Sequence, residues 1–344
     1  FLLGQRSLPL VRGALFYVMV LFTGTMTIIL KKNTIKSRRK ERSLYMIHKI
    51  QVDPTVQKYK LLPNIPYCCV NGHTLCLNII MPDNRPPSGA PINPDGLPAS
   101  DTRFPLLIYL AGGGFRFTDP FSWLPMLTYF CERGYIVATV DYRCSGESRF
   151  PAAIQDVKCA IRFLRKNAYE YEIDPTKITL MGDSAGGYLA VMTGATNGNP
   201  KFETEEYQEY SSEVQCVCDY FAPVNFLTLN ESCENSMEDH NASRSPESEF
   251  LGAALPTIPE ICQAANPLNY ISSNTPPTII FHGTDDRAVG PGQSVELYET
   301  LTASGIPSEL YLIENAGHVG PEFHQPEVLS LVNGFIKKHL DPAN

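Results

Sequence analysis

The chain has 344 residues, of which 43% are hydrophobic and 19% are charged, and its formal net charge at pH 7 is -8. This composition excludes a disordered chain and is sufficient for one large core. Outside one basic cluster the sequence is acidic and has no basic stripe, which argues against nucleic-acid binding. We predict an N-terminal extension over residues 1–45 and one globular domain over residues 46–344.

The N-terminal extension contains eighteen uncharged residues, 13–30, between Arg12 and Lys31. A membrane-spanning helix needs about 20 apolar residues. Seven basic residues follow within residues 31–42 and two arginines precede, so the positive-inside rule places the following domain in the cytosol. We expect a single-pass membrane anchor here. Two alternatives are a buried core helix and a soluble cytoplasmic protein from whose mature form residues 1–45 are absent.

Ten cysteines and two N-glycosylation sequons are relevant to the cellular compartment of the protein. No C-x-x-C pair is present, Cys69 and Cys76 lie in apolar runs, and Cys159 lies on an apolar helix face. We therefore expect most cysteines to be small buried hydrophobic residues, and no metal or organic cofactor. The sequons at Asn230 and Asn241 would matter only in a lumenal domain.

The globular part alternates apolar strand-like runs with helix-like runs. Asn71-Gly72 predicts the turn of a hairpin, and a Pro- and Gly-rich loop follows it. The expected strands are residues 67–82 (as the hairpin), 104–110, 135–143, 177–181, 276–283 and 309–314, and the expected helices are 151–167, 292–305 and 326–340. This order predicts a mostly parallel sheet with helices on both faces. Residues 197–259 are polar apart from the apolar run 214–224, and a small cap excursion is expected at about residues 227–262.

A glycine-bracketed serine stands at one strand-to-helix junction. The segment "GDSAG", residues 182–186, fits G-x-S-x-G, in which small neighbours allow a sharp turn that exposes the serine hydroxyl. Serine is a weak nucleophile unless a base removes its proton. Ser184 is therefore the candidate nucleophile, provided that a histidine and a carboxylate reach it.

Candidate partners follow two later strands. Asp285 and Asp286 come after strand 276–283, and His318 comes after strand 309–314. The carboxyl ends of parallel strands share one edge of the sheet, so we expect His318 to be the base and an aspartate to orient it. His324 is the second candidate base, and His282 is expected to pack beneath its loop.

Backbone N–H groups near the serine could stabilise a developing oxyanion. Ala185 supplies one because it follows the nucleophile. The run Ala111–Gly114, at the end of strand 104–110, is the expected source of the others.

Together these residues resemble the α/β-hydrolase superfamily, specifically the acetyl-esterase and hormone-sensitive-lipase-like carboxylesterases. The resemblance extends over residues 65–340 and rests further on "DYRCSGESRFPAAIQDVKCAIRFLRKNA", "SPESEFLGAAL", "ANPLNYI", "HGTDDRAVGPGQS" and "AGH". It implies an α/β-hydrolase fold, Asp286 as the catalytic acid, and Gly113 and Gly114 as oxyanion glycines.

Two positions depart from the pattern of that family. Ala111 stands where its members usually carry histidine, a side chain thought to brace the loop, although the backbone donors remain. Gly290 replaces the usual proline and is expected to loosen the loop that carries Asp286.

The resemblance implies a serine carboxylester hydrolase with a preference for short acyl chains. A formamidase or lactonase would use the same residues, and a non-catalytic binding protein of this fold is a further alternative. The expected partner is a small ester.

Overall fold

A computed structural model describes residues 49–51, 58–83, 103–233, 236 and 238–341. The chain divides into two units, Phe1–Asp53 and Pro54–Asn344. In the first unit only residues 49–51 are described, and they are neither helix nor strand. The predicted anchor, residues 13–30, and the predicted boundary at residue 45 lie outside the described residues. Within the described part of the chain, no helix has the length and apolar character that a membrane span requires.

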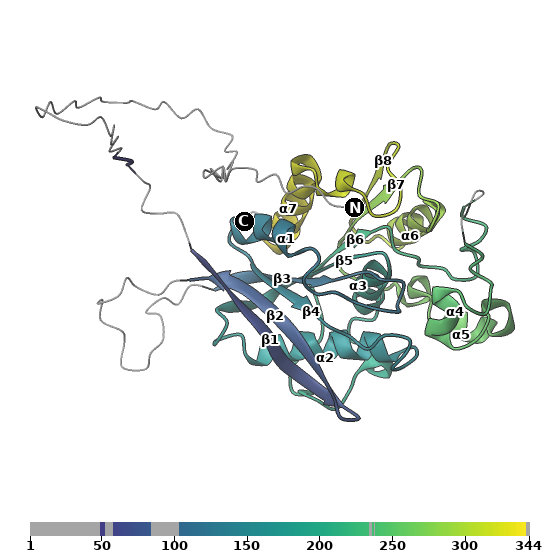
Figure 1. The fold of residues 1–344 in the computed structure, drawn as a ribbon, viewed down its shortest axis with the longest axis horizontal. Helices are drawn as coiled ribbons and strands as arrows, with labels where there is room; N and C mark the ends of the chain where they lie inside the picture. Colours follow the sequence, from purple (N-terminus) through teal and green to yellow (C-terminus); the bar gives the residue numbers. More distant parts are fainter. Residues whose placement is uncertain (1–48, 52–57, 84–102, 234–235, 237, 342–344) are drawn as a thin grey trace, which may run out of the picture. The chain divides into compact units, whose positions relative to one another are not determined.

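The second unit contains an eight-stranded sheet in the order β1-β2-β4-β3-β5-β6-β7-β8 (Figure 1). Its first two strands pair antiparallel, as do β2 and β4, whereas the neighbours from β4 to β8 are parallel. The strands are β1 (Tyr59–Val70), β2 (His73–Pro82), β3 (Phe104–Leu110), β4 (Ile136–Val140), β5 (Ile173–Asp183), β6 (Cys216–Tyr220), β7 (Thr278–Gly283) and β8 (Ser308–Ile313). The mostly parallel sheet that the sequence predicted is confirmed.

Helices cover both faces of the sheet, as expected (Figure 1). Apolar side chains of α1 and α7 join one core cluster, and those of α2, α3 and α6 join the other. The helices are α1 (Leu124–Cys131), α2 (Ala152–Lys166), α3 (Ala185–Ala195), α4 (Pro246–Leu251), α5 (Pro259–Ala264), α6 (Gly292–Ala303) and α7 (Pro326–Leu340), with short 3-10 helices η1 (Pro200–Phe202), η2 (Leu255–Thr257), η3 (Pro267–Tyr270) and η4 (Pro321–His324). Two core layers therefore enclose the sheet.

The predicted hairpin is present but longer than expected. Asn71 and Gly72 turn with φ values of 50° and 82°, which a two-residue hairpin of this hand requires. The first strand starts at Tyr59 rather than at residue 67, because it continues through Pro63 and Pro66 at an outer position of the sheet. Proline is tolerated in such edge strands, so a proline there does not end the strand.

The ten cysteines are all free thiols, and six of them are buried. The six buried cysteines belong to the two apolar clusters. Two lie on β6, one lies on each of α1, α2 and α5, and one lies in the loop that follows β4. Most of the cysteines therefore behave as small hydrophobic residues, as the sequence predicted.

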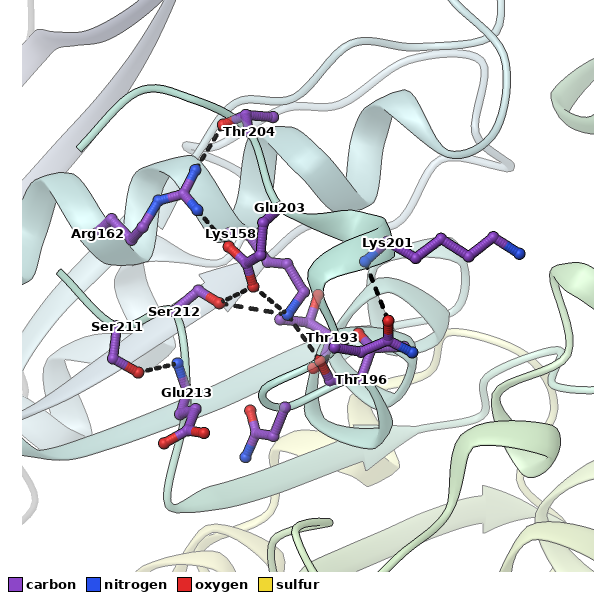
Figure 2. Close-up of polar contacts among 12 residues, drawn as sticks. Lys158, Arg162, Thr193, Thr196, Lys201, Glu203, Thr204, Ser211, Ser212 and Glu213 are labelled. Atoms are coloured by element: carbon purple, nitrogen blue, oxygen red, sulfur yellow. Dashed lines mark hydrogen bonds and ion pairs between the residues drawn. The ribbon is translucent and has the colours of Figure 1, made fainter. Parts of the chain in front are cut away.

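Two buried cations on α2 hold the segment that follows η1 (Figure 2). Nζ of Lys158 donates to the carbonyl of Thr196 at 2.9 Å and to Oε1 of Glu203 at 3.0 Å. The Arg162 guanidinium pairs with the other oxygen of Glu203 and donates to Thr204. The segment is thereby fixed against α2.

Candidate active site

Ser184 occupies a strained turn between β5 and α3. Its φ of 51° and ψ of -121° lie outside the regions favoured by residues with a side chain. A Cβ on Gly182 would lie 2.4 Å from the carbonyl oxygen of Gly186, and a Cβ on Gly186 would lie 2.1 Å from that of Leu110. Only glycine permits these approaches. The turn thus places Ser184 at the carboxyl edge of the sheet.

Ser184, His318 and Asp286 form a continuous hydrogen-bonded chain. Nε2 of His318 lies 2.9 Å from Oγ of Ser184, and its Nδ1 lies 2.6 Å from Oδ2 of Asp286. The three residues follow β5, β8 and β7. The structure therefore brings together the three residues that the sequence selected, and the geometry is that of a nucleophile, a base and an orienting acid.

The Asp286 carboxylate is buried and held by its own loop. Its Oδ1 accepts hydrogen bonds from the N–H groups of Ala288 and Val289, both at 2.9 Å. Burial raises the pKa of this carboxyl, but contacts with His282 and His318 outweigh burial and hold the pKa well below its usual range. Asp286 is therefore ionised and can stabilise a protonated His318.

The glycine loop after β3 lies against the nucleophile turn. Gly113 has a φ of 143°, and a Cβ there would lie 2.1 Å from the carbonyl oxygen of Phe117. Within the described part of the chain, the N–H groups of Gly113, Gly114 and Ala185 donate no hydrogen bond. These donors are available to a ligand, as an oxyanion site requires.

The structure shows how the loop is braced although Ala111 replaces a histidine. The Tyr142 hydroxyl donates to the Ala111 carbonyl at 2.5 Å, and the N–H of Gly112 donates to Oδ1 of Asp183 at 2.9 Å. The same carboxylate accepts a hydrogen bond from the Tyr109 hydroxyl. The backbone therefore has two fixed points next to Gly113 and Gly114.

Sequence reasoning missed these bracing residues. Asp183 precedes the nucleophile inside the quoted motif, and its acidic side chain in an otherwise small and apolar segment was the available signal. Burial raises its pKa, and hydrogen bonds from Tyr109 and Gly112 lower it only in part. Tyr109 gave no comparable signal, because it lies within an apolar strand.

Phe221, just after β6, lies beside the base. It is fully buried, and its ring centroid lies 4.6 Å from that of His318. It also packs at 4.6 Å against Phe323. Phe221 therefore packs against the ring of His318 from within the core.

The remaining candidate histidines lie away from the nucleophile. His282 is buried beneath its loop, as expected, with Nε2 at 2.8 Å from the Val289 carbonyl. His324 packs edge-on against Trp123 at 4.0 Å, and burial lowers its pKa to about 4. His318 is thus the histidine that contacts Ser184.

Gly290 is constrained by packing. A Cβ at this position would lie 1.9 Å from the carbonyl oxygen of Ser232. The expectation that glycine loosens this loop is not supported by the geometry, because the loop is packed against residue 232 and bonded to Asp286. The departure from proline instead allows a close backbone approach.

Helix α4 contacts the segment that follows Gly113 and Gly114. Phe250 stacks on Phe115 with centroids 4.2 Å apart, and Nε of Arg116 lies 2.7 Å from Oε2 of Glu249. Ser245 caps the helix by accepting from the Ser248 N–H at 3.1 Å. Helices α4 and α5 lie between β6 and β7 in the chain, and their assignment as a cap at about residues 227–262 stays a prediction.

The chain is similar in sequence to known esterases. Esterase LipQ of Mycobacterium tuberculosis is 29% identical over 225 residues, which are 64% of this chain and 51% of LipQ. The chain therefore spans about half the length of the curated relatives it matches.

Solved structures support the same fold. A truncated carbohydrate esterase from gut microbiota superposes with a TM-score of 0.70 at 24% identity, covering 82% of this chain and 96% of that one. The propionate-bound esterase Est2 of Thermogutta terrifontis gives a TM-score of 0.61 at 26% identity, covering 84% and 97%. The predicted α/β-hydrolase fold is confirmed.

The family model BD-FAE matches residues 97–301. This region is more than half of the chain and contains the glycine loop, Ser184 and Asp286. The chain therefore belongs to the BD-FAE family.

Proposed function

We propose that this protein is a serine carboxylester hydrolase that acts on esters of short carboxylic acids. The observation that carries the proposal is the hydrogen-bonded chain from Ser184 through His318 to Asp286. The named esterases among its relatives support the same reaction class.

The residues suit a two-step acyl transfer. His318 takes the hydroxyl proton as Ser184 attacks the ester carbonyl, and returns it to the departing alcohol oxygen. The N–H groups of Gly113, Gly114 and Ala185 face the oxyanion that forms. Water then attacks the acyl carbonyl as His318 takes its proton. The bond between the acyl carbon and Oγ of Ser184 breaks, His318 returns the proton to Oγ, and the acid leaves.

The preference for short acyl chains is part of the proposal. It was inferred from the resemblance to acetyl esterases, and the propionate-bound Thermogutta structure is in keeping with it. A panel of p-nitrophenyl esters from acetyl to long acyl chains tests it, with the highest kcat/KM expected for the shortest chains. An optimum at long chains would contradict the preference without affecting the reaction class.

A fluorophosphonate probe tests the reaction class. The folded wild-type chain is expected to be labelled covalently, and Ser184→Ala is expected to be unlabelled. His318→Ala should lower ester turnover by on the order of 10⁴-fold or more, whereas His324→Ala should retain turnover. Absence of labelling in folded protein would favour a non-catalytic binding protein, and hydrolysis of amides or lactones in preference to esters would favour the formamidase or lactonase alternative.

Membrane association through residues 13–30 is a separate part of the proposal, supported by the eighteen uncharged residues and the basic flank. The full chain should sediment with membranes after expression in cells and resist extraction by salt, while a chain that starts at Met46 should not sediment. Extraction of the full chain into the soluble fraction without detergent would refute it.

A further inference from the structure

Two thiols and a carboxylate meet on the side of α2 that faces β1. The Sγ atoms of Cys68 and Cys159 and a carboxylate oxygen of Glu206 all lie within 4.8 Å of one another. In a tetrahedral zinc site with Zn–S bonds of about 2.3 Å, neighbouring ligand atoms are about 3.8 Å apart. Small side-chain movements would therefore bring these three atoms to zinc-binding distance.

An irregularity in β1 directs Cys68 toward α2. The pairing of β1 with β2 shifts between Pro66, opposite Cys76, and Cys68, opposite Leu75, so Tyr67 is an extra residue. Successive side chains of a regular strand point to opposite faces, and a bulge of one residue breaks this alternation. Tyr67 and Cys68 accordingly both pack on the same core cluster, which also contains Cys159.

The segment that carries Glu206 is fixed in place from both sides. Glu203 is held by Lys158 and Arg162 of α2 (Figure 2). The Tyr207 hydroxyl donates to the Tyr67 carbonyl at 3.0 Å. Glu206 lies between these anchored residues, so its carboxylate remains close to the two thiols while the residue itself stays exposed to solvent.

The chemistry of the three groups matches one kind of ligand. Two sulfurs and one carboxylate oxygen are a donor set that Zn²⁺ accepts, and a solvent-exposed side leaves a fourth position for water. Cys216 and Cys218, which lie close to each other on β6, form a different kind of pair. Both have essentially no exposed surface, and both belong to the other apolar cluster. The pair at Cys68 and Cys159 differs in having a carboxylate and access to solvent.

The two cysteines would bind a metal ion as thiolates. Binding of one Zn²⁺ would form two Zn–S bonds and release two protons to solvent, with no change in oxidation state. The nearby guanidinium groups of Arg143 and Arg162 partly offset the negative charge that results.

We propose that Cys68, Cys159 and Glu206 bind a Zn²⁺ ion that joins β1, α2 and the segment after η1. The site is separate from the Ser184 centre and does not depend on the proposed esterase activity.

Titration with Co²⁺ as a spectroscopic substitute for zinc tests this proposal. The full chain is reduced, freed of metal with a chelator that is then removed, and titrated with Co²⁺. We expect a thiolate-to-cobalt charge-transfer band that saturates at one ion per chain and is abolished when Zn²⁺ displaces the cobalt.

Matched variants separate this site from other thiols. Cys68→Ser and Cys159→Ala should abolish the band. Glu206→Gln should weaken Co²⁺ binding by at least about 10-fold, which is the loss seen when a residue that only orients a metal ligand is replaced. Cys69→Ser is the control, because Cys69 is the exposed neighbour on the same strand, and it should retain the band. Circular dichroism verifies that each variant is folded.

Three results would overturn the proposal. The first is a folded, reduced wild-type chain that shows no thiolate-to-cobalt band. The second is a band that survives in Cys68→Ser or in Cys159→Ala, or that has the wild-type affinity for Co²⁺ in Glu206→Gln. The third is a band that is lost in Cys69→Ser alone.

Discussion

The two oxygens of the Asp286 side chain have separate tasks. Oδ1 accepts from two backbone N–H groups of its own loop, and Oδ2 lies 2.6 Å from His318. Both interactions require an acceptor. An amide side chain has a single acceptor oxygen, so it cannot satisfy the loop and the histidine together.

Asp286→Asn is therefore expected to retain the fold and lose activity. A corresponding substitution in a well-studied serine protease costs about 10⁴-fold in kcat because the histidine adopts the wrong tautomer, and we expect a loss of the same order for ester turnover. Asp285→Asn is the matched control, since Asp285 is the exposed neighbour. Equal losses in the two variants would contradict the assignment of Asp286.

Glycine 290 gives a second prediction at this scale. Gly290→Ala places a Cβ 1.9 Å from the Ser232 carbonyl oxygen, so it should lower the free energy of unfolding by about 1–3 kcal/mol, as overpacking does. Gly334→Ala, in α7 with nothing within 4 Å of the new Cβ, should instead raise it by about 0.5–1 kcal/mol. Urea denaturation measures both, and a stabilised Gly290→Ala would show that the approach to Ser232 relaxes freely.

At the scale of elements, α2 acts as an anchor through buried charges. Lys158 has no exposed side-chain surface and Arg162 almost none, whereas their common partner Glu203 is 27% exposed. Removal of the partner leaves buried cations unpaired, which is more costly than removal of one cation. The segment that Glu203 begins therefore depends on a single carboxylate.

Glu203→Gln should accordingly destabilise the chain by about 3 kcal/mol, near the lower end for a broken buried ion pair. Lys158→Met should cost less, about 2 kcal/mol, because the hydrogen bonds to Thr196 and Glu203 are lost at about 1 kcal/mol each while Arg162 still pairs with Glu203. The midpoints of urea unfolding of the two variants show which substitution is the more destabilising. A larger loss for Lys158→Met would contradict the argument.

The elements that could be predicted are those in which apolar residues follow a recognisable strand or helix pattern and turn residues mark the ends. Helix α2 and strands β3, β5, β7 and β8 were predicted from such patterns. Ser184, Asp286 and His318 follow β5, β7 and β8 respectively. Strand β6 was seen only as an apolar run, because Asp219 interrupts its apolar character. Helix α1 was missed, since its eight residues are nearly all apolar and show no helical period.

Ser184 and His318 could be predicted because each follows a recognisable strand, whereas the choice of Asp286 over Asp285 came from the family resemblance. The bracing of the glycine loop could not be predicted, because the contacts of Ala111 and Gly112 join residues 31 and 71 positions apart in the sequence. Such contacts arise from the packing of β3 beside β5 and β4. The acidic side chain of Asp183 stands out in its segment, but no pattern along the chain identifies its partners.

At the scale of the whole molecule, one buried acid links stability to pH. Burial raises the pKa of Asp219, on the interior strand β6, to about 8. Between about pH 4 and pH 8 the folded chain retains a proton that the unfolded chain releases. Stability from this group is thus complete below about pH 4 and is lost as pH rises, by about 1.4 kcal/mol per pH unit.

Asp219→Asn removes this dependence. The variant should gain stability relative to the wild type as the pH rises from 5 to 7.5, as measured by urea unfolding at both values. Glu299→Gln, an exposed position on α6, is the control and should show no such trend. A constant difference between Asp219→Asn and wild type would mean that Asp219 is already ionised in the fold.

The irregular outer strand has a consequence for association between molecules. β1 is the last strand at its end of the sheet, its pairing with β2 shifts twice, and Pro63 and Pro66 are exposed along it. Each proline lacks the N–H that a neighbouring strand would need, and each shift bends the strand away from a flat template. A second chain therefore finds no continuous ladder here, and this end of the sheet is protected against edge-to-edge aggregation.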